Sequence, residues 1–213
     1  MTQDDTQRSP TVQLTLPNTY GVQASELRHA LEARHSQREF SDTPIALADL
    51  AAILWAGQGA GTTPSAASQY PLQLHVAAAR VDELEAGVYC FNASAAHLSV
   101  RRADDVLGDL EAATLGDQPW VGQAAAVLLV SADLGAMREH FNDQPPQGER
   151  GFRYAYMEAG AALQNIGLMT AALGLGGVIV GGFDDAVVSN IFELSEAQRP
   201  VALYAAGVID QST

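Results

Sequence analysis

The sequence predicts a single α+β domain in which helices pack against a central sheet. Three observations support this. Segments with helical spacing are mixed with short apolar segments typical of strands, the chain shows no internal repeat, and no linker is long enough to divide it. A chain of 213 residues with 47% hydrophobic and 17% charged residues can bury a large core without disulfides or metals. We expect residues 1–22 to form an N-terminal arm and residues 23–213 to form one domain.

Two segments with apolar side chains at helical spacing open the domain. Residues 24–36 form the first, with Ser25 as a candidate N-cap. Residues 46–61 repeat the pattern and end in glycines, which favour a helix terminus. The small polar residues and two prolines at 62–71 predict a loop. Three short strands are then expected, at residues 72–79, 86–93 and 96–102.

One long helix dominates the second half of the chain. We predict it at residues 152–173, after a polar, variable loop at 141–151. Polar residues and glycines interrupt its apolar run, which favours the buried centre of a globular fold or dimer over a membrane span. The other elements expected here are helices at 104–116 and 184–192 and strands at 124–132, 174–182 and 200–209.

The charge of the chain limits its partners. Its net charge is -14 and its isoelectric point is about 4.5, so neither nucleic acid nor an anionic membrane is expected to bind it. Every side chain with a full positive charge at neutral pH is arginine, and the absence of lysine excludes Schiff-base chemistry and a P-loop. The five histidines are scattered, so no metal site is predicted.

The single cysteine and the first residues of the chain indicate the cellular compartment in which the protein is expected. Cys90 lies in a predicted strand and cannot form an internal disulfide, which is typical of a reducing environment. The acidic, polar start does not resemble a signal peptide. We therefore expect a cytoplasmic protein.

Neither glycine cluster fits a dinucleotide-binding turn. The sequence GQGAGT at 57–62 follows a helix instead of a strand, and GLGG at 174–177 leads from a helix into a strand. The serines at 65 and 68 lack the strand-turn-helix setting of a nucleophile elbow. A Rossmann fold and a hydrolase triad are both disfavoured.

Basic residues gather at the end of the first predicted helix. Arg34, Ser36 and Arg38 alternate in a segment expected to be extended, so their side chains point one way and could converge on one phosphate. In an acidic chain without lysine, one concentrated positive site suits a phosphorylated cofactor. The alternative is a solvated helix face that carries basic residues by chance.

Six motifs in order resemble the FMN-dependent nitroreductases. EARHSQREF is similar to the segment that opens this family, and ILWAGQG, PSAASQYPLQLHV, GVY, the segment from Arg150 to Asp185 and ALYAAG follow in the family's order. The combination is most similar to the SagB-type branch, which includes dehydrogenases that oxidise azolines to azoles. The resemblance spans residues 25 to about 208. It implies a three-layer fold with a central mixed or antiparallel sheet flanked by helices, and a long central helix at a dimer interface.

The resemblance also implies roles for individual residues. The side chains that match those holding the FMN phosphate and ribityl chain are Arg34, His35, Ser36 and Arg38. The loop that matches the one reaching the flavin from the other subunit contains Pro64, Ser65, Ala66 and Ser68. Gly181 and Gly182 match the pair whose backbone amides face N5 and O4 of the flavin ring.

Two positions depart from the family pattern. Azoline dehydrogenases have a Lys-Tyr pair where this chain has Arg153-Tyr154, our candidate catalytic residues, and an arginine stays protonated at any working pH. The alternative is a solvent-facing Arg153 and a packed Tyr154. Nitroreductases commonly place a lysine or arginine beyond the last strand to contact the phosphate, but this chain ends GVIDQST.

The resemblance implies an FMN oxidoreductase that takes hydride from NADPH, NADH or an organic substrate. It also implies a homodimer with two shared FMN sites, for which the alternative is a monomer that buries the long helix internally. A second hypothesis is a flavin-binding protein without turnover, with a storage or sensing role. A third is an acidic interaction domain without a cofactor.

Overall fold

The computed structural model describes residues 22–59 and 61–210, so the predicted arm at 1–22 lies outside it except for Val22. In this part of the chain the helices are α1 (Val22–Ala33), α2 (Leu47–Gln58), the 3₁₀ turn η1 (Ala66–Ser68), α3 (Leu107–Ala112), α4 (Trp120–Gln123), α5 (Leu134–His140), α6 (Arg150–Ala172) and α7 (Asp185–Ile191). The strands are β1 (Leu72–Ala78), β2 (Gly87–Asn92), β3 (His97–Arg102), β4 (Ala126–Asp133), β5 (Gly176–Val180) and β6 (Gln198–Gly207).

These strands form one sheet in the order β3-β2-β1-β4-β6-β5, with every neighbouring pair antiparallel. The central strand β4 is buried along almost its whole length. Its side chains alternate between two apolar clusters: Leu128 and Val130 belong to one, and Val127 and Leu129 to the other. A sheet with apolar side chains on both faces must be covered on both sides.

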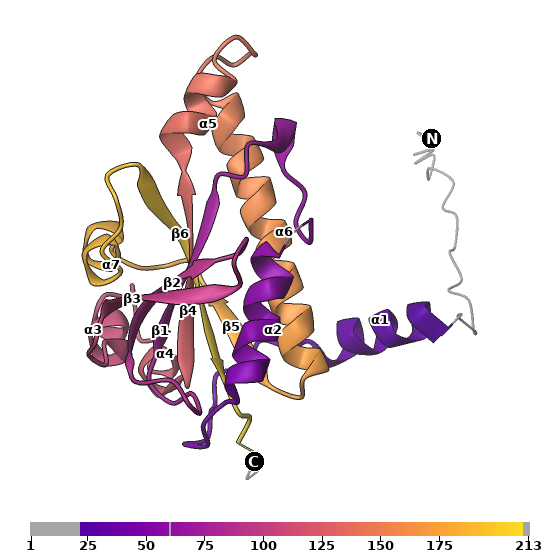
Figure 1. Ribbon diagram of the computed structural model, residues 1–213, viewed down its shortest axis with the longest axis vertical. Helices are drawn as coiled ribbons and strands as arrows, with labels where there is room; N and C mark the ends of the chain where they lie inside the picture. The colour runs from indigo at the N-terminus through magenta and orange to yellow at the C-terminus, as the bar shows by residue number, and fades with distance from the viewer. Residues whose placement is uncertain (1–21, 60, 211–213) are drawn as a thin grey trace, which may run out of the picture.

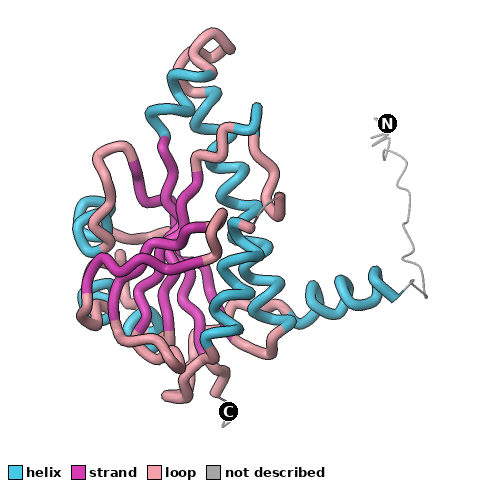
Figure 2. Tube along the Cα trace, in the orientation of Figure 1, coloured by secondary structure: helices cyan, strands magenta, loops and turns pink. Residues whose placement is uncertain are grey.

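Helices supply that cover, so the predicted three-layer α+β fold is confirmed (Figure 2). Helices α2, α5 and α6 bury side chains such as Leu50, Met137 and Ile166 against one face. Helices α3, α4 and α7 bury Leu110, Val121 and their neighbours against the other. The long helix α6 runs beside α2, and α1 projects away from this layer (Figure 1).

The structure corrects several sequence-based boundaries. The first helix begins at Val22, so Ser25 lies inside it and the N-cap prediction is wrong; no glycine or proline between residues 22 and 25 interrupts the helix. Helices α4 and α5 were not predicted, because four and seven residues carry too little periodicity. Asp133 caps α5 by accepting a hydrogen bond from the N–H of Ala136 at 2.8 Å.

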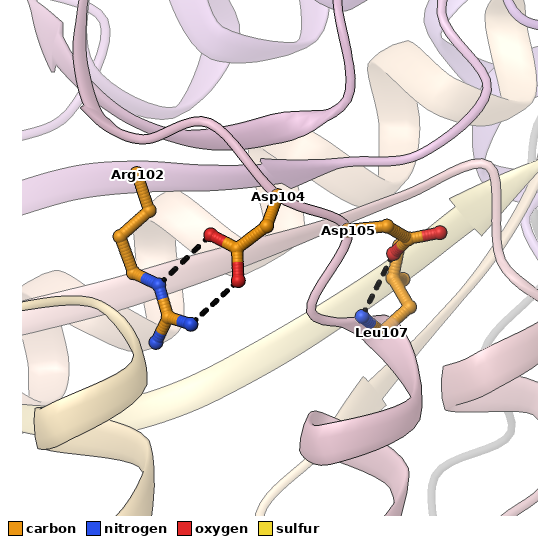
Figure 3. Close-up of polar contacts among 4 residues, drawn as sticks. All are labelled: Arg102, Asp104, Asp105 and Leu107. Atoms are coloured by element: carbon orange, nitrogen blue, oxygen red, sulfur yellow. Dashed lines mark hydrogen bonds and ion pairs between the residues drawn. The ribbon is translucent and has the colours of Figure 1, made fainter.

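Two carboxylates order the connection from β3 to α3 (Figure 3). Arg102 donates to both oxygens of Asp104, over 3.1 Å from Nε and 2.6 Å from the terminal nitrogen, and this pairing lowers the pKa of Asp104. Asp105 accepts a hydrogen bond from the N–H of Leu107 at 3.0 Å, which satisfies a donor of the first turn of α3. Because the Arg102–Asp104 pair is exposed to solvent, it adds little to the stability of the protein, and its main effect is to fix the path of the turn.

A buried polar cluster interrupts the apolar side chains of the sheet. His75 of β1 lies with its Nε2 3.1 Å from the hydroxyl of Ser131 on β4, and that hydroxyl donates to Gln198 at 2.9 Å. Burial, and secondarily the charge of Arg101, lowers the pKa of His75 to about 4. The histidine is therefore neutral in the folded protein at physiological pH.

The buried histidine predicts a loss of stability on mild acidification. Above pH 6.5 His75 is neutral in both states. Between pH 6.5 and about 4 only the unfolded chain takes up the proton. The free energy of unfolding therefore decreases as the pH is lowered through this range, by about 3 kcal/mol in total. Urea unfolding between pH 7.5 and 4.5 measures this loss. A His75→Gln variant should lose less stability over that range, and an equal loss in both proteins would contradict the assignment.

Candidate functional site

The predicted phosphate-binding segment follows α1 and runs along the open edge of the sheet. Ser36 forms a parallel bridge with Gly177 of β5, and the N–H of Gln37 donates to the carbonyl of Gly177 at 3.0 Å. A little further on, the N–H of Ser41 donates to the carbonyl of Val208 at 2.9 Å. The sheet edge therefore holds the backbone of residues 36–41 in place.

The two arginines of this segment contact different elements. The stem of Arg34 lies over Gly167 of α6, where an added Cβ would be 3.5 Å from its Cδ. The guanidinium of Arg38 lies over the indole ring of Trp120, 5.2 Å from the ring centre. His35 lines a small hollow between α6 and β6. Convergence of Arg34, Ser36 and Arg38 on one phosphate remains a prediction.

The predicted glycine pair follows β5 directly. The carbonyl of Gly182 accepts hydrogen bonds from the N–H of Leu115 at 2.8 Å and from the side-chain amide of Gln118 at 3.1 Å. A Cβ at Gly181 would meet no described heavy atom within 4 Å, and its backbone is not in the left-handed region. The packing of one subunit therefore does not require glycine at this position.

The segment 114–120 contacts both the arginine segment and the glycine pair, and no functional role is predicted for it from the sequence. Gln118 contacts Gly182, while Trp120 lies under Arg38. The indole N–H of Trp120 is buried and has no hydrogen-bond partner among the described residues. A tryptophan directly after the polar sequence GDQP was the available signal, but its partners come from distant parts of the chain.

The loop with Pro64, Ser65, Ala66 and Ser68 packs on the first half of α6. The N–H of Ala66 donates to the buried carboxylate of Glu158 at 2.7 Å. Both Ala67 and Ser68 have positive φ, at 49° and 55°, a conformation rarely adopted by residues other than glycine. Glu158 precedes Gly167 by nine residues, about 13 Å along the helix. The loop and Arg34 therefore contact α6 at separate places within one subunit.

The candidate catalytic pair lies near the start of α6. Arg153 is exposed, whereas the ring of Tyr154 packs edge-on against Phe141, 4.7 Å between ring centres. The hydroxyl of Tyr154 donates to Gln144 at 3.2 Å. Among the described residues, no hydrogen bond joins this pair to the arginine segment or to the glycine pair. A catalytic role for Arg153 and Tyr154 stays a prediction.

One surface formed by α1, α2 and α6 is apolar and exposed. Leu27 and Leu31 of α1 and Trp55 of α2 are each at least half exposed, and Met157 of α6 is 66% exposed. A hollow of about 340 Å³ lies on this surface, between α2, α6 and Ala30 of α1. We call this surface the α6 face. Apolar surface of this extent normally marks an interaction site.

Residues 22–59 and 61–210 contain neither a metal-binding cluster nor a membrane-spanning helix. No group of three or more His, Cys, Asp or Glu side chains there is arranged to hold a metal ion. No helix in the same residues is long and apolar enough to cross a membrane.

Comparison with known proteins identifies the family. The model of the nitroreductase family matches residues 31–208. A Methanocaldococcus jannaschii protein classed with the nitroreductases is 33% identical over 192 residues, covering 87% of this chain and 92% of the relative. A Ralstonia eutropha structure of the same class has a TM-score of 0.72 at 25% identity, covering 96% of this chain and 88% of that one.

Two more distant structures share the fold. An Anabaena variabilis structure of the same class has a TM-score of 0.77 at 24% identity; the match covers 92% of this chain but only 41% of that one. The NADPH:FMN oxidoreductase of Vibrio harveyi, solved with NAD+, has a TM-score of 0.63 at 21% identity, covering 87% of this chain and 70% of that one. Since the family model and the archaeal relative agree over most of the sequence, this chain belongs to the nitroreductase family, a family of oxidoreductases that are generally flavin-dependent.

Proposed function

We propose that this protein is an FMN-dependent oxidoreductase that binds the flavin along the β5 edge of its sheet. The observation that carries the proposal is that the two predicted cofactor segments lie at opposite ends of one strand, β5. The arginine segment is fixed to Gly177 near the start of β5, and Gly181 follows its end. Four residues of extended chain separate these points by about 13 Å, a span suited to a cofactor with a phosphate at one end and a ring at the other.

The residues present fit such a cofactor. Arg34, His35, Ser36 and Arg38 would hold the phosphate and ribityl chain, and the unpartnered indole N–H of Trp120 is a buried donor beside Arg38. The open space at Gly181 admits the edge of a flat ring. Bound FMN supplies two-electron redox chemistry that no side chain of this protein provides. The backbone N–H groups of Gly181 and Gly182 would stabilise negative charge on the ring.

We further propose a homodimer that buries the α6 face and completes two cofactor sites. Nitroreductases are typically homodimers. Exposed and half-buried positions of α6 recur at helical spacing at Met157, Gly160, Gln164 and Leu168, which forms a continuous stripe for a second helix. The loop at Pro64, Ser65, Ala66 and Ser68 would contact the flavin of the partner subunit.

The reaction we propose is hydride transfer from NADPH, NADH or an organic substrate, followed by reduction of a second substrate. A SagB-type dehydrogenase is the finer proposal, with Arg153 and Tyr154 beside the substrate. Because the arginine stays protonated, its role there is to bind or orient and not to shuttle a proton. We place the protein in the cytoplasm. The competing function is flavin binding without turnover, for storage or sensing.

Removal of either arginine should weaken FMN binding. Each of Arg34→Ala and Arg38→Ala removes a charge-assisted phosphate contact of roughly 1.5 to 3 kcal/mol, so the dissociation constant should rise about ten- to a hundredfold. Ser36→Ala should have a smaller effect. Flavin fluorescence quenching measures all three, with Arg101→Ala, an exposed arginine of β3, as the matched control. Unchanged dissociation constants in both arginine variants would show that the segment does not bind the phosphate.

A further inference from the structure

The glycine pair lies just beyond the sheet and has few anchors of its own. Gly181 and Gly182 follow Val180, whose pairing with Leu203 is the last between β5 and β6. A Cβ at Gly181 would meet no described atom within 4 Å, so packing does not hold this residue either. Glycine backbone is also freer than that of other residues. Hydrogen bonds are therefore needed to fix the direction of the two N–H groups.

The segment between α3 and α4 supplies hydrogen bonds to this part of the chain. The N–H of Leu115 donates to the carbonyl of Gly182 over 2.8 Å. Two residues further on, the N–H of Asp184 donates to the carbonyl of Ala113, also over 2.8 Å. Both are main-chain contacts. The side chain of Gln118 adds a second contact to Gly182, because its amide nitrogen donates to the same carbonyl over 3.1 Å.

The amide group of Gln118 has one satisfied orientation. Its nitrogen lies 2.9 Å from the carbonyl oxygen of Leu115 and 3.1 Å from that of Gly182. Both neighbours are acceptors, so the NH₂ group must face them and the amide oxygen must face away. Its two N–H donors then match the two carbonyls, one in its own segment and one in the glycine pair. The half-buried side chain therefore ties the glycine pair to the segment before α4.

We propose that Gln118 is a positioning residue that holds the N–H groups of Gly181 and Gly182 toward the flavin ring and so raises the midpoint potential of the bound cofactor. The inference rests on the proposed function. Reduced FMN carries more negative charge on its ring than oxidised FMN, so N–H groups with a fixed direction stabilise the reduced form more. Gln118 acts on the flavin only through the glycine pair.

The test compares the midpoint potential of FMN bound to the wild type and to Gln118→Met. Methionine keeps the length of the side chain and removes both N–H donors without adding charge. We expect the affinity for reduced FMN, relative to oxidised FMN, to fall about three- to tenfold. For a two-electron couple, a tenfold change corresponds to a potential about 30 mV lower. Reductive titration with dithionite measures the potential, so the test does not depend on the protein's own electron donor.

The matched control is Gln73→Met. The side chain of Gln73 on β1 also donates to two main-chain carbonyls, those of Leu74 and Phe91. Strands β4 and β6 separate β1 from β5, so this variant should leave the potential unchanged. Gln118→Ala removes the same donors as Gln118→Met and gives the same test if the methionine variant does not fold.

Hydrogen exchange in the flavin-free protein checks the contact independently of the cofactor. The amide of Leu115 is bonded to the carbonyl that Gln118 also holds. Its exchange should be about three- to tenfold faster in Gln118→Met and unchanged in Gln73→Met, because loss of the side-chain contact makes local opening easier.

The outcomes separate the inference from the proposed function. An unchanged potential in a Gln118→Met protein that binds FMN, whether or not its overall affinity falls, overturns the positioning role alone. An unchanged exchange rate at Leu115 does the same. A wild-type protein that binds no FMN overturns the proposed function and this inference with it.

Discussion

A Gly181→Val variant is expected to fold normally and to lose FMN, with its affinity reduced more than about a hundredfold. No described atom lies within 4 Å of the added Cβ, and the backbone there is compatible with a side chain, so the subunit itself should tolerate valine. The branched side chain would occupy the space through which the flavin ring approaches the backbone N–H groups. Loss of close contact along a ring edge costs several kcal/mol, since both packing and hydrogen bonds are lost.

Circular dichroism and flavin titration together measure this result. The matched control is Gly108→Val in α3, where an added Cβ also meets nothing within 4 Å and no cofactor contact is proposed. Gly182→Val should also weaken FMN binding, although its Cβ would contact Leu115 at 3.5 Å. If the Gly181→Val protein binds FMN as tightly as wild type, the glycine pair is not part of the flavin site.

A Met157→Asp substitution is expected to produce a monomer that has lost its FMN. Met157 is the most exposed large apolar side chain of α6, and a two-fold interface on the α6 face would bury it in both subunits. Each dimer would then hold two unpaired carboxylates, at a cost of several kcal/mol. Because the loop at 64–68 is proposed to complete the partner's site, cofactor loss should accompany dissociation.

Light scattering with a flavin absorption spectrum measures both effects. Val100→Asp changes a similarly exposed apolar residue on β3, outside the α6 face, and should leave a dimer with its FMN. A wild-type monomer of 22.4 kDa that retains FMN would exclude the shared site.

Periodicity was sufficient to predict the elements that bury the most apolar surface. The helix predicted at 152–173 matches α6 within two residues, and the apolar segment at 124–132 matches the central strand β4. Short elements were missed: α5 has seven residues, and its clearest signal is the single cap Asp133. The start of α1 was misplaced because serine is common both at caps and inside helices.

The candidate site was predicted only where local sequence carries its chemistry. The arginine segment and the glycine pair could be named from their motifs; in the structure the first lies beside the start of β5 and the second directly follows its end. Arg38 contacts Trp120, and the hydroxyl of Tyr204, a residue of β6, lies close to Gly167 of α6. Both contacts join residues far apart in the sequence. Contacts of this kind depend on how the layers pack, which no single segment encodes.

Anaerobic mixing of the FMN-loaded protein with NADPH tests the central claim most directly. The absorption of the oxidised flavin is followed in a stopped-flow instrument, and air or an organic acceptor is then admitted. The account predicts that NADPH bleaches the bound flavin and that the acceptor restores its colour over repeated cycles. A protein whose bound flavin is unchanged by NADPH, NADH and organic donors would be a flavin binder without turnover. A protein that stays colourless after FMN is added would contradict the account entirely.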